Sequence, residues 1–133
     1  MSPPMDTLTT DDLGPYAKFL GLELDSATGD EVTAHLTVRP DLHQPYGIAH
    51  GGVHCSVVET IASVGAAMWL GDRGKVVGVS NSTDFYRAVS DGTLRATARP
   101  VHRGRSQQVW VVEIVDDQER TVSRGQVRLQ NLS

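Results

Sequence analysis

The 133-residue sequence lacks the features of several large classes of protein. It has one cysteine, Cys55, so no disulfide can form within the chain, which is typical of a reducing compartment. Its longest basic run is Arg103-Gly104-Arg105 and its net charge is −4, which argues against bulk binding to nucleic acid. No basic region followed by an apolar run marks a signal peptide near the N-terminus. The longest apolar-rich stretch, Val57 to Leu70, is too short for a membrane span and contains Glu59.

From these absences we expect a soluble protein of the cytoplasm, with neither membranes nor nucleic acids among its partners. The composition is ordinary for a globular protein, with 39% apolar and 21% charged residues. A chain of this length suits one domain, which buries roughly two-thirds of the surface that the unfolded chain exposes. We expect residues 1–9 to be a flexible N-terminus and residues 10–133 to form that single domain.

Hydrophobic periodicity predicts the elements of this domain. Helical spacing of apolar residues between Thr10 and Gly21 predicts one short helix, with Gly21 as its C-cap. Residues 51–70 contain no proline and almost no charge, and they are apolar on nearly every face, which is typical of a buried helix. Alternation with a period of two predicts strands at residues 22–27, 32–38, 75–86, 93–102, 107–116 and 120–130. The predicted fold is α+β, a mostly antiparallel sheet of about six strands around one long helix.

The start of the long helix has the composition of an oxyanion site. The loop that begins at Gln44 ends in His50, Gly51 and Gly52, where the helix begins. Without side chains, the two glycines let a ligand carbonyl approach the backbone N–H groups closely, and the positive end of the helix dipole favours negative charge there. Gln44 and His50 add side-chain donors nearby.

One carboxylate stands in the apolar helix. Cys55, Glu59 and Ser63 are spaced by four and share one face. An ionised glutamate on a buried face is costly unless it is paired or borders a wet pocket, and Ser63 could hold a water beside it. Oxyanion donors together with a base or nucleophile are the parts for acyl transfer to water.

Helix geometry separates these parts. Glu59 lies about 12 Å beyond Gly51 along a helix with a rise of 1.5 Å per residue, which is too far for both to act on one carbon. A two-fold dimer with antiparallel helices would bring each Glu59 to the Gly51 of its partner.

Simpler interpretations remain open for each residue. Gly51 and Gly52 suit a plain joint between loop and helix, and Glu59 suits a solvated helix edge. His50 and His54 are four apart, but a zinc-binding HExxH motif has its glutamate between the histidines, so we expect no metal. Cys55 lacks an evident activating base and suits a small core residue.

The late basic residues also have two interpretations. Arg103, Arg105, Arg124 and Arg128 fall on predicted turns and strands. They suit a solvated face of the sheet, or a site in which guanidinium forks capture phosphate groups.

The chain resembles the hotdog-fold acyl-CoA thioesterases of the phenylacetate-degradation-related superfamily. The similar branch includes Arthrobacter-type 4-hydroxybenzoyl-CoA thioesterase, the enterobactin proofreading thioesterase and 1,4-dihydroxy-2-naphthoyl-CoA thioesterase. The resemblance covers about residues 12–131, and the segments that carry it are residues 44–52, 59–63, 76–79, 87–89 and 104–110.

The resemblance implies a role for each residue of the motif. Gln44 and His50 would orient the thioester and the water, and the N–H of Gly51 would polarise the thioester carbonyl. Glu59, from the partner subunit, would act as nucleophile or general base. Ser63 would position the water.

The resemblance also implies substrate contacts. Gly52 would line the substrate site beside Gly51. Phe85 occupies a position at which related enzymes have a histidine that contacts the aromatic ring of the acyl group. Arginines take the CoA phosphates in this family, and Arg105 and Arg124 are the candidates here.

The expected reaction is hydrolysis of an acyl-CoA to the free acid and CoA, and the resemblance implies that the pairing of Gln44 with Glu59 favours an aryl-CoA. It uses no metal or redox cofactor. We expect a homodimer as the active unit and a dimer of dimers, a homotetramer, as the assembly. One alternative is a non-catalytic acyl-CoA-binding module on the same fold. A hydratase ranks last because the sequence shows no suitable Asp/His pair.

Overall fold

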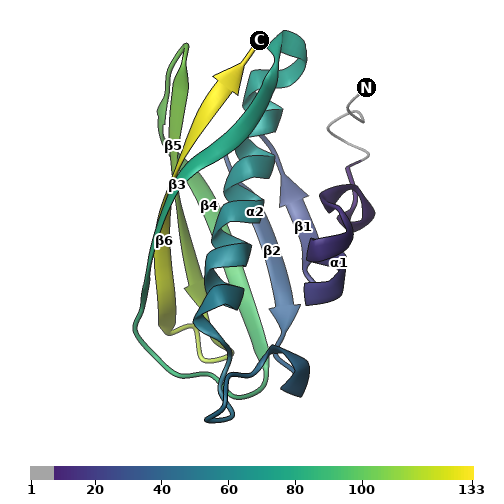
Figure 1. Cartoon of the computed structure of the whole chain (residues 1–133), viewed down its shortest axis with the longest axis vertical. Coiled ribbons are helices and arrows are strands. Elements are labelled where there is room, and N and C mark those ends of the chain that lie inside the picture. The colour runs from purple at the N-terminus through teal and green to yellow at the C-terminus, as the bar shows by residue number, and fades with distance from the viewer. Residues whose placement is uncertain (1–7) are drawn as a thin grey trace.

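The computed structural model describes residues 8–133, so residues 1–7 of the predicted flexible N-terminus lie outside the described residues. One long helix, α2 (Gly51–Leu70), crosses one face of a single sheet (Figure 1). A 3-10 turn, η2 (Thr10–Leu13), and a short helix, α1 (Pro15–Leu20), precede the sheet. The strands are β1 (Glu23–Ala27), β2 (Val32–Thr37), β3 (Lys75–Phe85), β4 (Thr93–Arg103), β5 (Gln107–Val115) and β6 (Thr121–Leu132). Two further 3-10 turns are η3 (Pro40–Leu42) and η4 (Gly71–Arg73).

The six strands are antiparallel throughout, in the order β1-β2-β4-β5-β6-β3. The chain therefore has the hotdog fold, and the predicted α+β class is confirmed. The strand that follows α2 does not pair with its sequence neighbour β4 but crosses to β6 at the far edge. This crossover places β3 beside α2 and leaves one side of the strand without a partner strand among residues 8–133.

The predicted helix 51–70 is found with those bounds, and the predicted strands are found within two residues at each end. The predicted short N-terminal helix with Gly21 as its C-cap is confirmed as α1, but its predicted start at Thr10 is wrong, because η2 is a separate 3-10 turn. Gly14 has a φ of 97°, and Pro15 has no N–H with which to continue the preceding turn. Gly21 ends α1 in the left-handed region, with a φ of 80°.

The expectation that α2 is buried on nearly every side is also wrong for the single chain. The side facing the sheet is fully buried through Val57, Val58 and Ile61. The opposite side, which carries Glu59 and Ala67, is exposed. A single sheet can cover only one side of a helix, so the apolar residues of the other side remain available to a partner.

The length of α2 also has a plain explanation in this fold. Together with η4 it forms a helical segment, Gly51–Arg73, whose length and apolar composition alone would let it cross a membrane. This segment is longer than Val57 to Leu70, the stretch that the sequence analysis judged too short to span a membrane. The core helix of a globular domain meets the same criteria, and half of the apolar window is buried inside this domain.

The closest approach of α2 to the sheet occurs at Gly65. A Cβ atom built on Gly65 would lie 2.5 Å from Cζ3 and 2.6 Å from Cη2 of Trp110. The Trp110 ring is fully buried, and its indole N–H donates to Oε1 of Gln108 at 2.9 Å, so the ring has little freedom to move. The absence of a side chain at position 65 therefore sets how closely the helix packs on β5.

We predict that Gly65→Ala destabilises the protein. Overpacking against a fixed ring should cost about 3 kcal/mol, offset by about 1 kcal/mol from the better helix propensity of alanine. Chemical unfolding of the variant and the wild type measures the difference. In the background of Trp110→Phe, which has a shorter ring, the cost should shrink. An equal cost in both backgrounds would contradict the proposed clash.

Candidate active site

The loop before α2 is held in a compact form by its own backbone. The N–H of Gln44 donates to the carbonyl of Ile48 at 2.8 Å, and the N–H of His50 donates to that of Leu42 at 2.9 Å. These bonds close residues 42–50 into a compact loop just before the helix. The loop therefore fixes the position of the first residues of α2.

Two of the predicted polar side chains at this point are engaged within the loop. Nδ1 of His50 accepts the N–H of Gly52 at 2.8 Å, which places the proton of a neutral imidazole on Nε2. Oε1 of Gln44 accepts the N–H of Tyr46. Each side chain therefore keeps one donor, its Nε2 group, for a ligand. Among residues 8–133 no acceptor is bonded to the N–H of Gly51, which leaves this N–H as the free donor at the start of α2.

Phe85 lies directly over Gly51. A Cβ atom on Gly51 would come within 2.9 Å of both Cε2 and Cζ of the Phe85 ring. That ring is 53% exposed, and its centroid lies 5.7 Å from that of His54. A ligand atom that reaches the N–H of Gly51 thus passes beside an aromatic ring, at the end of β3.

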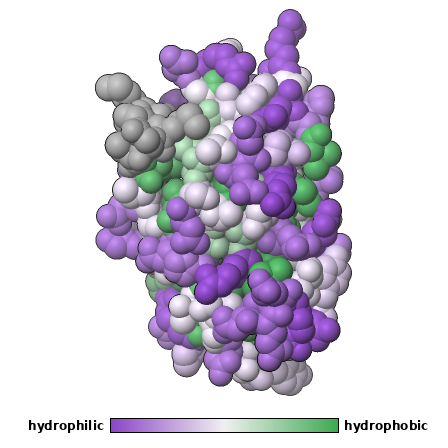
Figure 2. All heavy atoms as spheres, turned by 180° about the vertical axis from the view of Figure 1, so that it is seen from behind, coloured by the Kyte–Doolittle hydropathy of each residue, from purple (hydrophilic) through white to green (hydrophobic). Residues whose placement is uncertain are grey.

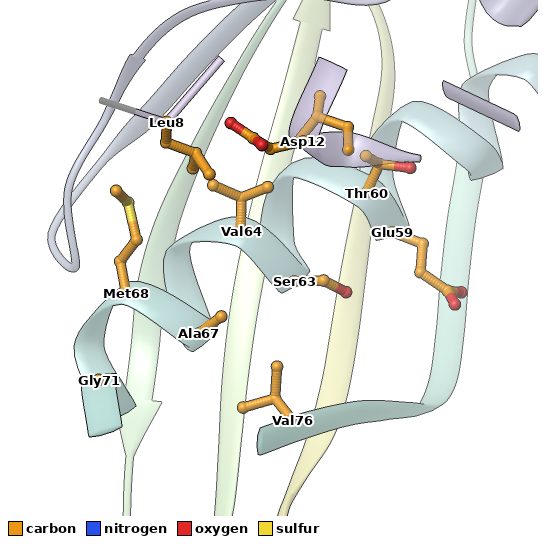
Figure 3. Close-up of a pocket in the computed structure, with 11 residues that line it drawn as sticks. Leu8, Asp12, Glu59, Thr60, Ser63, Val64, Ala67, Met68, Gly71 and Val76 are labelled. Carbon is orange, nitrogen blue, oxygen red and sulfur yellow. The ribbon is translucent and has the colours of Figure 1, made fainter. Parts of the chain in front are cut away.

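Glu59 lies two turns further along α2, at the side of a hollow of about 550 Å³. Figure 3 shows Glu59 and Ser63 leaving the same side of the helix on consecutive turns. The hollow lies between α2, η2 and the start of β3, and its lining includes Leu13, Glu59, Ser63, Val64, Met68 and Val76. The predicted shared face of the helix is confirmed, and it borders open space.

The carboxylate of Glu59 contacts a residue that the sequence analysis missed. Nδ2 of Asn81, on β3, donates to Oε1 of Glu59 at 3.3 Å and to the carbonyl of Cys55 at 3.0 Å. Asparagine is uncommon inside strands, and its presence in the middle of β3 is the one signal that could have pointed to it.

The structure does not bring all of the predicted residues together. Gly51 and Glu59 lie on one straight helix, about 12 Å apart along its axis. Within one chain the candidate residues therefore fall into two separate groups: Gly51 with Gln44 and His50, and Glu59 with Ser63.

The four late arginines do not form one cluster. Arg103 donates to Oδ1 of Asp30 at 2.7 Å, and Arg124 lies 3.8 Å from Glu113 on the neighbouring strand. Arg105 lies in the turn before β5, at the end of α2 opposite to Gly51. Gln107 pairs with Gln130, so Arg105 and Arg124 are separated by about 20 Å along β6 and cannot hold the same phosphate group within one chain.

The two histidines of the possible metal motif face different partners. His50 bonds to the backbone, while Nδ1 of His54 lies 2.8 Å from Oγ of Ser123 in the core. In the part of the chain that the structure describes, no three His, Cys, Asp or Glu side chains are grouped to hold a metal ion.

Burial lowers the pKa of His54 below its usual value of 6.5, because an imidazolium is poorly solvated in the core. The unfolded chain therefore takes up a proton at His54 at a higher pH than the folded chain. We predict that this contribution to stability is complete above about pH 6.5 and is lost as the pH falls below it.

Thermal melting of the wild type and of His54→Asn between pH 8 and pH 5 tests this. Asparagine can bond to Ser123 but does not titrate, so the variant should lose less of its melting temperature over the acidic range. The other four histidines are common to both proteins. Parallel curves for the two proteins would rule out His54 as the source.

Comparison with known proteins agrees with this architecture. The family model of the Thioesterase superfamily matches residues 46–123. The candidate esterase MT1895 of Mycobacterium tuberculosis is 52% identical over 121 residues, 89% of this chain and 86% of that protein. The proofreading thioesterase EntH of Cronobacter turicensis is 34% identical over 116 residues, 87% of this chain and 85% of that protein.

A solved structure agrees equally well. The crystal structure of S. sahachiroi AziG is 59% identical in sequence and superposes with a TM-score of 0.89, over 90% of this chain and 98% of that chain. The family match spans the start of α2, Glu59, all of β3 and the strands β4 and β5. The chain therefore belongs to the Thioesterase superfamily.

Proposed function

We propose that the protein hydrolyses an acyl-CoA thioester to a free carboxylic acid and CoA. Family membership supports hydrolysis of a thioester. The observation that carries the proposal is Glu59, an exposed carboxylate on an otherwise apolar helix, beside a hollow of about 550 Å³. A carboxylate in this position lies outside the apolar core, and it suits attack on a bound acyl group.

The free N–H of Gly51 supplies the second part of the chemistry. In the proposed reaction it donates a hydrogen bond to the thioester carbonyl oxygen, and the positive end of the α2 dipole stabilises the negative charge that develops there. The remaining Nε2 donors of Gln44 and His50 orient the thioester and the water. Gly52 has no side chain and so leaves room for the His50 ring, whose Nδ1 would lie 3.0 Å from a Cβ atom on Gly52.

Two courses of reaction fit Glu59. As a general base, it takes a proton from a water held by Ser63 while the water oxygen bonds to the carbonyl carbon; the C–S bond then breaks and the proton passes to the sulfur. As a nucleophile, its oxygen bonds to the carbonyl carbon and displaces the thiolate, and water then cleaves the resulting anhydride. Neither course uses a metal or a redox cofactor.

We propose a homodimer as the active unit, with antiparallel α2 helices. Gly51 and Glu59 are too far apart in one chain to act on one carbon, so a partner would complete each site. β3 supports this arrangement: it is an edge strand of 11 residues whose Val77 and Val79 are 44% and 48% exposed. The face opposite to that of Figure 1 is mainly hydrophilic, with hydrophobic residues only in scattered groups (Figure 2). Pairing of two dimers into a homotetramer remains part of the proposal.

The substrate is proposed to be an aryl-CoA or a related acyl-CoA. The hollow beside Glu59 is lined on its far side by Val64, Met68 and Val76, which suit an apolar acyl group. Phe85 would contact the thioester end of the substrate from its place over Gly51. Of the proposed phosphate-binding arginines, Arg105 is the better candidate, because Arg124 lies beside Glu113.

A panel of acyl-CoA substrates tests the proposal. Aryl-CoAs, polyketide-like acyl-CoAs and straight-chain acyl-CoAs are supplied to the purified protein, and the release of free thiol is measured. We expect the highest kcat/KM with an aryl-CoA, and a lower value with the matching acyl-pantetheine, which lacks the nucleotide. Tight binding of acyl-CoA without hydrolysis of any substrate would instead indicate a non-catalytic binding module. A protein with these properties would act in the cytoplasm, where CoA esters are available.

A further inference from the structure

The carboxylate of Glu59 is held from one side by a hydrogen-bonded chain on β3. Asn81 donates from Nδ2 to Oε1 of Glu59 at 3.3 Å and, with its other N–H, to the carbonyl of Cys55 at 3.0 Å. The second bond ties the amide to the backbone of α2, one turn before Glu59. The amide therefore has a fixed position relative to the helix that carries the carboxylate.

The orientation of this amide is also fixed. The hydroxyl of Thr83 donates to Oδ1 of Asn81 at 2.7 Å. A carbonyl and an ionised carboxylate can only accept hydrogen bonds, so the nitrogen of the amide must face α2 and its oxygen must face Thr83. Gly125 on β6 provides the space for this hydroxyl, because a Cβ atom there would lie 2.4 Å from Oγ1 of Thr83.

The other oxygen of Glu59 lies over a glycine. A Cβ atom on Gly78 would lie 3.2 Å from Oε2 and 3.4 Å from Cδ of Glu59. Gly78 stands at an irregularity in the pairing of β3 with β6, which brings its bare backbone under the carboxylate. One oxygen is thus held by an amide, while the other faces a position without a side chain.

We propose that Asn81 is a positioning residue for Glu59, with Thr83 fixing the Asn81 amide, so that Oε1 is held and Oε2 is the oxygen that reacts. The inference rests on the proposed role of Glu59 in hydrolysis. Asn81 does not touch the substrate in this proposal. By donating to the carboxylate, it limits the rotation of a side chain that is otherwise exposed.

Asn81→Ala removes the donor and should lower kcat about 10- to 100-fold, since a hydrogen bond to a charged group contributes about that factor. KM should change little, because the substrate contacts remain. Thr83→Val should have a smaller effect in the same direction, and no added effect in the Asn81→Ala background.

Asn81→Asp keeps the shape and gives a readout that a structural role would not produce. Over part of the pH range the new carboxyl group and Glu59 would share one proton. Only in this singly protonated form can position 81 still donate a hydrogen bond to Glu59. The variant should therefore be active on the acidic side and lose activity at the higher pH where the wild type is active. Asp12 on the η2 wall of the hollow and Cys55 are the other titratable groups nearby, and both are unchanged.

Ser82→Ala is the matched control, since the Ser82 side chain lies on the opposite face of β3 and is exposed. It should leave kcat and the pH profile unchanged. If Glu59→Ala is inactive while Asn81→Ala and Thr83→Val keep the wild-type kcat and pH profile, this inference is overturned and the proposed function stands. If Glu59→Ala is itself fully active, the proposed function fails first.

Discussion

Glu59→Ala should lose turnover by about a thousandfold or more on the best acyl-CoA substrate, since a positioned base or nucleophile contributes about 10²- to 10⁴-fold. The folded state should persist, because Glu59 is exposed and such substitutions usually change stability by less than about 0.5 kcal/mol. Thiol release under saturating substrate measures kcat. Size-exclusion chromatography and thermal melting show whether the assembly and fold are retained.

Two further variants separate the charge of Glu59 from its shape and its surroundings. Glu59→Gln keeps the size of the side chain but removes the base, and it should be nearly as inactive as Glu59→Ala. Thr60→Ala changes the next residue, which lines the same hollow, and it should keep most of the activity. Full activity in Glu59→Gln would show that the carboxylate has no chemical role.

The regular elements could be predicted from the sequence because their periodicity is local. Apolar residues continue without proline from position 51 to 70, so the bounds of α2 follow from composition alone. Residues 10–21 also have helical spacing, but Gly14 and Pro15 divide them into two elements. The positive φ of Gly14 and the missing N–H of Pro15 interrupt the helix there, although the spacing of apolar residues would allow it to continue.

The order of the strands could not be obtained in this way. β3 follows α2 directly in the sequence, yet it pairs with the last strand, β6. Such pairing depends on contacts between residues that are far apart in the chain, whereas alternation reports only which residues share a face. The resemblance to hotdog proteins supplied the topology that the pattern lacked.

In the candidate site, too, residues marked by a local pattern could be predicted, whereas contacts between distant elements could not. Gly51 and Glu59 were found because unusual residues stand in a strongly patterned helix. Asn81 was missed because its importance lies in contacts between β3 and α2. The position of the Phe85 ring over Gly51 is likewise a contact between two elements, and no spacing in the sequence predicts it.

Gly51→Val should reduce kcat about 100- to 1000-fold, the usual effect of losing one oxyanion donor. The new side chain would meet the Phe85 ring and would cover the N–H that the carbonyl must reach. Phe85 is half-exposed and can move, so the fold should tolerate the change. Activity should stay low in Gly51→Val/Phe85→Ala, because relief of the clash does not uncover the N–H. Recovery in that double variant would place the effect in Phe85 instead.

Mixing the two inactive variants tests whether each site is shared between subunits. In a heterodimer of Glu59→Ala with Gly51→Val, one site receives Gly51 from the first chain and Glu59 from the second, and both are intact. Equal mixing by co-refolding gives such heterodimers in half of the dimers, with one good site each, so about a quarter of the wild-type activity should return. If each site were built within one chain, every site in the mixture would carry one of the two substitutions, and no activity would return. The separation of Gly51 and Glu59 along α2 leads us to expect the recovery.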